Sequence, residues 1–333
     1  MIPFQRRQFL LNSLGLSAIG ISQESLFAAS EPQLLQLSSL ANPKANAKQK
    51  EQTEKNESKL PPPLFKLSLS AYSFRQDLQL KAQQKPRKTL EDFIRFAATF
   101  PITAVELTEY YFYATDKPYL AKLKALASKL GLDISSLAIR NDFCLIDGVK
   151  REQEVVKVRK WLEIASFLGA KTVRIFAGSV PKNSTENDIL PICVETMKKA
   201  IPAARDLGIY LALENHGGIT ATPESLLKIV RDADSPWLGI NMDTGNFHGT
   251  DPYAELGLIA DKTKVVQIKT DIQPKGKAIQ ETDFVKIRTL LEKVSYRGYV
   301  VLEYEGKEDR YSAVPSYLQK LHDCFILQID RKR

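Results

Sequence analysis

The nonapeptide YLALENHGG, residues 210–218, carries the clearest structural signal in this chain. Its apolar run, residues 211–213, ends abruptly at Glu214, His216 and two glycines. An apolar run of that length bounded by glycine is typical of a buried strand whose C-terminal end opens into a polar loop. A carboxylate at such a point has left a dry interior without reaching bulk water, and it is normally paired, metal-bound or catalytic.

Three later strand ends place similar side chains. Asp243 lies in GINMDTGNFHG, Gln267 and Lys269 lie in VVQIKTD, and Glu303 lies in VVLEYEG. Four strands that deliver oxygen-bearing side chains from the same end form one site. We therefore expect a functional site at these strand ends.

Around these motifs, apolar segments of strand length alternate with longer segments of helical period, from residue 64 to residue 328. The predicted strands cover residues 64–71, 104–107, 133–139, 172–177, 210–213, 238–242, 265–269 and 299–302. The predicted helices cover residues 89–100, 118–130, 152–168, 187–207, 223–231, 252–260, 283–293 and 313–328. Eight strand–helix units in about 270 residues predict an α/β fold, a (β/α)8 or TIM barrel.

A doubly wound open sheet is the competing fold, but no glycine-rich phosphate turn follows the first predicted strand. In a TIM barrel the active site lies at the C-terminal ends of the strands. The sequence places five charged side chains at those ends: Glu106, Glu214, Asp243, Lys269 and Glu303. The predicted fold and the predicted site therefore support each other.

The N-terminal 63 residues differ from the rest in composition. Arg6 and Arg7 precede an uncharged apolar segment, residues 11–22, and small residues follow at positions 28–30. Residues 1–30 resemble a twin-arginine export signal, and an amphipathic helix is the alternative. Residues 31–63 are rich in Gln, Lys, Asn, Glu and Ser and end in three prolines, which predicts a disordered linker. The signal predicts export to the periplasm or cell envelope.

Composition narrows the function classes. The net charge of +8 is scattered along the chain, whereas a nucleic-acid surface needs a concentrated basic face, so we expect no nucleic-acid partner. We expect no membrane span after removal of the signal, because no apolar run is long enough. Cys144, Cys193 and Cys324 are widely spaced and are expected to be buried free thiols.

The motifs ENHGG, MDTGNFH and LEYEG, in this order and strand spacing, resemble those of the xylose-isomerase-like barrels, the sugar-phosphate isomerase and epimerase group. That resemblance implies one divalent metal ion, held by Glu, Asp, His and Glu from strands five to eight. The corresponding residues are Glu214, Asp243, Gln267 and Glu303, so Gln267 replaces the expected histidine. An oxygen-only set would favour Mn²⁺ or Mg²⁺, with Co²⁺ or Zn²⁺ possible, and loss of the metal stays open.

Five further residues are candidates for substrate binding, each with a structural alternative. His216 could bind substrate or transfer a proton, while His248 and Asn246 could bind substrate or order the loop after strand six. Lys269 could neutralise an enediolate or form a buried salt bridge. Glu106 could contact sugar hydroxyls or serve the core.

The resemblance implies a sugar isomerase or epimerase that removes a proton next to a carbonyl, with Glu214 and Glu303 as the catalytic pair. One alternative is β-elimination of a 3-keto-glycoside on the same site. Another is a carbohydrate-binding barrel without catalysis. Metal-assisted phosphodiester hydrolysis needs more histidines than this chain supplies. Export favours a free or oxidised small sugar as substrate, because phosphorylated sugars are mainly cytoplasmic.

Overall fold

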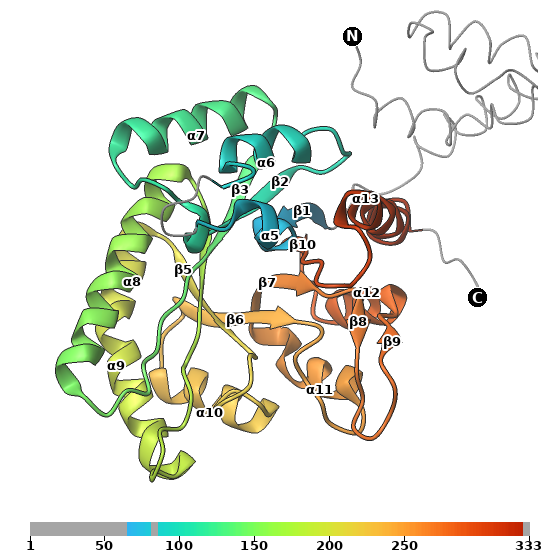
Figure 1. Cartoon of the computed structure of the whole chain (residues 1–333). Helices are drawn as coiled ribbons and strands as arrows, with labels where there is room; N and C mark the ends of the chain where they lie inside the picture. The colour runs from blue at the N-terminus through green and yellow to red at the C-terminus, as the bar shows by residue number, and fades with distance from the viewer. Residues whose placement is uncertain (1–64, 81–85, 329–333) are drawn as a thin grey trace, which may run out of the picture. The chain divides into compact units, whose positions relative to one another are not determined.

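The alternation of apolar strands and capped helices closes into a barrel of eight parallel strands in the computed structural model (Figure 1). The structure describes residues 65–80 and 86–328. The predicted export signal and linker lie outside these residues and stay predictions. The predicted TIM barrel is confirmed.

Each barrel strand is a short apolar segment buried along most of its length. The barrel strands are β1 (Lys66–Ser70), β2 (Ala104–Thr108), β3 (Asp133–Ala138), β4 (Thr172–Ile175), β5 (Tyr210–Glu214), β6 (Leu238–Asp243), β7 (Thr263–Ile268) and β10 (Tyr299–Leu302). Each pairs with the next in sequence, and the barrel closes where β10 pairs with β1, with Lys66 opposite Tyr299. The C-terminal ends of all eight strands consequently meet at one end of the barrel.

Helices lie outside the strands and cover them (Figure 1). They are α6 (Leu90–Ala97), α7 (Lys117–Lys129), α8 (Gly148–Leu168), α9 (Glu186–Leu207), α10 (Pro223–Ala233), α11 (Pro252–Ile259), α12 (Phe284–Lys293) and α13 (Arg310–Leu321). Thr89 caps α6 in a capping box with Asp92, and Thr222 caps α10. Shorter elements are η2 (Ala71–Phe74), α5 (Arg75–Leu78), η3 (Glu109–Tyr111), η4 (Ala260–Lys262) and η5 (His322–Ile326).

Several element boundaries differ from the predictions, and those of α8 and α13 differ the most. Helix α8 begins at Gly148 rather than residue 152, because the Asp147 carboxylate accepts hydrogen bonds from the first free backbone N–H groups. Helix α13 begins at Arg310 and ends at Leu321, where a π turn replaces the predicted continuation. A small hairpin, β8 (Asp271–Ile272) and β9 (Gln280–Glu281), follows β7 and was not predicted.

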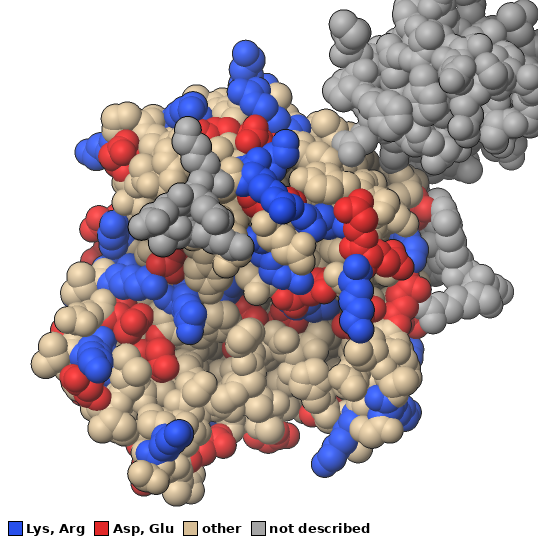
Figure 2. Space-filling view, viewed as in Figure 1, with Lys and Arg blue, Asp and Glu red and all other residues tan. Residues whose placement is uncertain are grey.

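The remaining surface and core features agree with the composition. The three cysteines are buried. Acidic and basic side chains are interspersed over the face seen in Figure 2. Within the described ranges, no helix is long and apolar enough to cross a membrane.

Candidate active site

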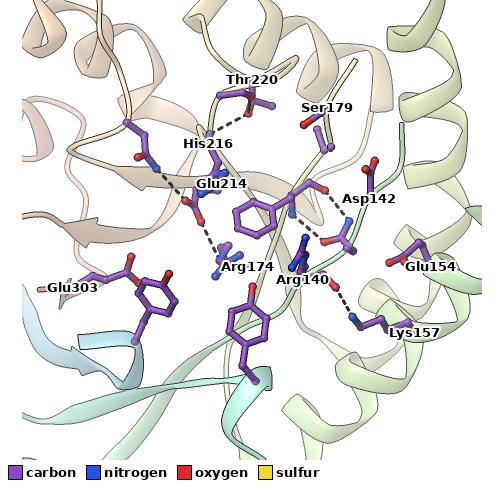
Figure 3. A pocket seen from close by; sticks show the side chains of 18 of the residues that line it. Arg140, Asp142, Glu154, Lys157, Arg174, Ser179, Glu214, His216, Thr220 and Glu303 are labelled. Atoms are coloured by element: carbon purple, nitrogen blue, oxygen red, sulfur yellow. Dashed lines mark hydrogen bonds and ion pairs between the residues drawn. The ribbon is translucent and has the colours of Figure 1, made fainter. Parts of the chain in front are cut away.

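The C-terminal ends of the barrel strands open into a cavity of about 700 Å³ (Figure 3). Five of the predicted residues line this cavity: Glu214, His216, Asn246, Lys269 and Glu303. Glu106, Asp243 and Gln267 are fully buried, and the Gln267 amide donates hydrogen bonds to both Glu106 and Glu303. The structure therefore brings the predicted strand-end residues together. Those that line the cavity form its wall, and the fully buried ones form a layer behind that wall.

Glu214 ends β5, and its carboxylate is held by one ion pair and one hydrogen bond. Its Oε2 lies 3.0 Å from Nε of Arg174, and its Oε1 accepts a hydrogen bond of 3.1 Å from Nδ2 of Asn246. The Arg174 guanidinium comes from β4 and lies 4.1 Å from the ring centre of Phe176 (Figure 3). Burial raises the pKa of Glu214 well above its ordinary value, although Arg174 opposes this rise.

Lys269 directly follows β7 and carries a buried positive charge among carboxylates. Its Nζ contacts Oε1 of Glu303 and lies 3.4 Å from Oδ2 of Asp243 and 2.8 Å from Oε2 of Glu305. Burial alone would raise the pKa of Glu303, but the Lys269 ammonium outweighs it, so that pKa is lowered. Burial raises the pKa of Asp243 to about 7. The two wall carboxyl groups, Glu214 and Glu303, thus have pKa values shifted in opposite directions.

Gln267 lies in β7 and links the two layers of the site. Its Oε1 accepts a hydrogen bond of 2.6 Å from Nδ2 of Asn241. Its Nε2 donates to Oε1 of Glu106 at 2.8 Å and to Oε2 of Glu303 at 3.1 Å. Because ionised carboxylates only accept hydrogen bonds, this amide presents its N–H groups to them and its oxygen to Asn241.

Glu106 is fully buried and does not line the cavity, which favours its core role over contact with sugar hydroxyls. Ser70 and Ser136 donate hydrogen bonds to its two oxygens, at 2.8 and 2.7 Å. Burial, followed by the negative charge of Glu303, raises the pKa of Glu106. Glu106 therefore supports the layer behind the cavity and helps fix Gln267.

The resemblance implied a divalent cation here, and the donor set of this site does not fit one. Lys269 and Arg174 pair with Glu303 and Glu214, and the oxygen of Gln267 is turned toward Asn241. In the described part of the chain, Oδ2 of Asp243 and Oε2 of Glu214 accept no hydrogen bond, but each faces a cation, Nζ of Lys269 at 3.4 Å and Nε of Arg174 at 3.0 Å. Among the described residues, no three His, Cys, Asp or Glu side chains are arranged to hold a metal ion.

The two candidate histidines have different surroundings. The His216 ring packs against Phe176, with ring centres 4.3 Å apart, and it borders the cavity (Figure 3). His248 is exposed, and its Nδ1 lies 3.4 Å from the carbonyl oxygen of Gln273. His248 does not line the cavity, which favours the alternative that it orders the loop after β6.

Sequence reasoning missed several residues of the cavity. Arg174 stands in the apolar segment TVRIFA, and a single charge inside such a segment was the available signal. Beyond Arg174 the cavity continues into an arm lined by Arg140, Asp142, Glu154 and Lys157, on the side away from Glu303 (Figure 3). Arg140 and Asp142 follow β3, and Glu154 and Lys157 lie in α8. From sequence alone, charged residues at these positions are expected to face solvent.

Comparison of the sequence with known proteins identifies a matching family and a related protein. The family described as xylose isomerase-like TIM barrel matches residues 94–321. An uncharacterized protein of Methanocaldococcus jannaschii is 35% identical over 102 residues, which are 29% of this chain and 35% of that relative. The match thus spans about a third of that curated relative.

Solved structures with the same fold include three whose sequences are distant. A xylose isomerase domain protein from Planctomyces limnophilus has a TM-score of 0.59 at 17% identity, over 81% of this chain and 100% of that chain. A 3-keto-D-glucoside 4-epimerase from E. coli has a TM-score of 0.62 at 15% identity, over 78% and 100%. A D-psicose 3-epimerase has a TM-score of 0.64 at 14% identity, over 79% and 99%.

Proposed function

The chain belongs to the xylose isomerase-like TIM barrel family, and from this premise we propose that it is a sugar isomerase or epimerase. It moves a proton at a carbon next to a carbonyl group of a small free or oxidised sugar. The observation that carries the proposal is a pair of buried carboxyl groups, Glu214 and Glu303, each beside its own cation in one cavity.

The placement of the pair suits a proton transfer between two faces of a substrate. Glu214 ends β5 and Glu303 directly follows β10, and β6 and β7 separate those strands in the barrel. A sugar in the cavity would therefore have one carboxyl group on each side. Pairs of carboxyl groups whose pKa values are shifted apart are typical of a base and an acid.

The chemistry follows from these charges. Ionised Glu303 removes the proton from the carbon beside the carbonyl, and the C–H electron pair forms a C=C bond while the carbonyl electrons move to oxygen. Lys269 and Arg174 stabilise the resulting enediolate oxygen. Glu214 then gives a proton back to the same carbon for epimerisation, and the carbonyl forms again. For isomerisation Glu214 protonates the former carbonyl carbon, while the proton of the neighbouring hydroxyl moves to the enediolate oxygen and the new C=O bond forms on the neighbouring carbon.

Two further facts support a sugar substrate. D-psicose 3-epimerase and 3-keto-D-glucoside 4-epimerase share this fold, at identities that leave the activity of this chain to experiment. The predicted export signal favours a free or oxidised sugar over a phosphorylated one. We accordingly propose a periplasmic or cell-envelope enzyme.

The arm of the cavity favours a second candidate, β-elimination of a 3-keto-glycoside. The same proton abstraction would then expel the group at the neighbouring carbon, with the electron pair of the broken bond leaving on that group. Arg140 and Lys157 in the arm could bind the departing portion. A product with a new C=C bond, together with a released alcohol or sugar, distinguishes this reaction from epimerisation.

Hydrogen exchange with deuterated solvent tests the proposal. The full chain is incubated with free ketoses and with 3-keto-glucosides, and loss of the proton beside the carbonyl is followed by NMR. The wild type should exchange this proton, and Glu303→Gln should slow the exchange at least about 100-fold, since an amide cannot remove it. Glu214→Gln should keep exchange through Glu303 but slow net epimerisation or isomerisation at least about 100-fold.

The matched control is Glu152→Gln, which changes an exposed carboxylate on α8 that pairs with Lys199. It should exchange at the wild-type rate. Exchange that persists in Glu303→Gln, or net conversion that persists in Glu214→Gln, would contradict the assignment of the pair. A wild type that binds a sugar without exchange would instead support the carbohydrate-binding alternative.

A further inference from the structure

We propose that Lys269 and Gln267 together take the place of a divalent cation in this site, so that the carboxylates are ordered without metal. The inference concerns the site of the proposed function. Its test needs neither substrate nor turnover, so its failure and the failure of the proposed function are distinguishable.

The first observation is the position of the Lys269 ammonium. It contacts Glu303 and lies within 3.4 Å of Asp243 and 2.8 Å of Glu305, with 11% of its side chain exposed. Its backbone is also fixed, because its N–H donates to Oγ1 of Thr244 at 2.9 Å. A cation entering between Asp243 and Glu303 would meet this charge at close range and be repelled.

The second observation is the orientation of the Gln267 amide. Its N–H groups point at Glu106 and Glu303, whereas a hard cation requires oxygen ligands. A turn of the amide by 180° about its last bond would face its oxygen toward two carboxylates, and would bring its N–H groups to the Asn241 amide nitrogen. The hydrogen bonds of the buried layer thus keep the N–H groups of the Gln267 amide directed toward Glu106 and Glu303.

The two residues act from one strand. Residues two apart in a strand point to the same face, so Gln267 and Lys269 both face the barrel interior. Gln267 also pairs in register with Asp243 of β6 and with Val301 of β10. One short segment, QIK, therefore supplies an N–H donor and an ammonium between the two strands that deliver Asp243 and Glu303.

Lys269 and Gln267 leave few carboxylate oxygens available as metal ligands. Within the described ranges, two carboxylate oxygens of the site accept no hydrogen bond, Oδ2 of Asp243 and Oε2 of Glu214. Each of them already faces a cation, Lys269 and Arg174 respectively. Hard divalent cations take about six or more oxygen ligands, mostly carboxylates, carbonyls and water. Two protein oxygens, each beside a positive charge, do not compete with water for such an ion.

Metal binding without substrate tests the inference. The purified full chain is first analysed for metal content. It is then treated with EDTA, freed of the chelator, and titrated calorimetrically with Mn²⁺ and separately with Co²⁺. The wild type should contain well under one equivalent of metal and give no saturable binding. The double variant Gln267→His, Lys269→Met should bind about one equivalent, at least tenfold more tightly than the wild type.

The matched control is Lys264→Met, which removes a lysine from the other end of the same strand, where its Nζ lies 4.5 Å from the ring centre of Tyr210. This variant should behave as the wild type. Stoichiometric, saturable Mn²⁺ or Co²⁺ binding by the wild type would overturn the inference, whatever the variants do. A double variant that keeps the wild-type circular dichroism and gains no metal would overturn the roles of Lys269 and Gln267.

Discussion

His216 and His248 are two histidines in neighbouring loops, and only the first borders the cavity. The His216 ring rests on Phe176, which also stacks with Arg174, the partner of Glu214. A ring held in this way can contact a sugar hydroxyl without taking part in the proton transfer. Its contribution should therefore appear in substrate binding.

We predict that His216→Ala raises KM about five- to tenfold and leaves kcat within about twofold. A contact made equally in ground state and transition state changes KM alone, and tenfold corresponds to about 1.4 kcal/mol. His248→Ala is the matched control and should leave both constants unchanged, because the exposed ring contacts the Gln273 carbonyl outside the cavity. Steady-state kinetics on the sugar that shows exchange gives both constants. Equal effects of the two substitutions would contradict the placement of His216.

Several residues of the site could be predicted from the sequence, but the pairing of its cations with its carboxylates could not. A polar side chain at the end of an apolar run marks a strand end, which identified Glu214, Asp243 and Glu303. Which cation pairs with which carboxylate depends on contacts across the closed barrel. Arg174 and Glu214 are 3.0 Å apart, yet they lie on different strands, so no local pattern joins them.

Among the elements, helix α8 shows how a single cap sets a boundary. The Asp147 carboxylate accepts hydrogen bonds from the backbone N–H groups of Val149 and Lys150, at 2.9 and 3.2 Å. These groups have no partner inside the helix, and a charged acceptor also suits the positive end of the helix dipole. The cap thus stabilises a first turn whose residues carry little apolar surface.

We predict that Asp147→Ala lowers the free energy of unfolding by about 1 kcal/mol, the usual cost of losing an N-cap. The control is Asp206→Ala, whose exposed carboxylate pairs with the adjacent Arg205, and it should change stability by less than about 0.5 kcal/mol. Urea unfolding followed by circular dichroism measures both values. An Asp147→Ala chain as stable as the wild type would show that the first turn does not depend on this cap.

The order and type of the eight strand–helix units followed from sequence, whereas several ends did not. Apolar periodicity identifies the middle of an element, and boundaries depend on caps and on tertiary contacts. The prediction placed the start of α8 four residues too late, because the first turn of this helix is mostly polar and shows no apolar period. The hairpin of β8 and β9 has two residues per strand, too few to produce a period.

For the whole molecule, barrel closure brings the first and last units together. Strand β10 pairs with β1, and beside this seam Arg310 of α13 donates a hydrogen bond of 2.6 Å to Oδ2 of Asp77 in α5. The Tyr311 hydroxyl donates to the same oxygen at 3.1 Å. Asp77 is buried, so this ion pair joins two segments more than 200 residues apart in a poorly solvated place.

The seam makes the stability of the barrel depend on pH. The hydrogen bond from Arg310 is the main cause that lowers the pKa of Asp77, while burial opposes it. A carboxyl group whose folded pKa lies below its unfolded value, about 3.9, contributes stability above that value and loses it as pH falls through the folded pKa. The contribution of this pair should thus be complete near neutral pH and vanish in acid.

We predict that Asp77→Asn lowers the free energy of unfolding by about 1–2 kcal/mol near pH 7, as expected for a hydrogen bond to a charged group. As the pH falls below about 3.9 and through the folded pKa of Asp77, the difference between the two chains should shrink toward zero, because protonated Asp77 then resembles asparagine. Urea unfolding across this pH range measures the difference, with Asp206→Asn as the exposed control. A difference that stays constant from neutral to acid pH would show that Asp77 acts through packing. The closure of the barrel would then depend on strand pairing and the apolar core, without help from this charge.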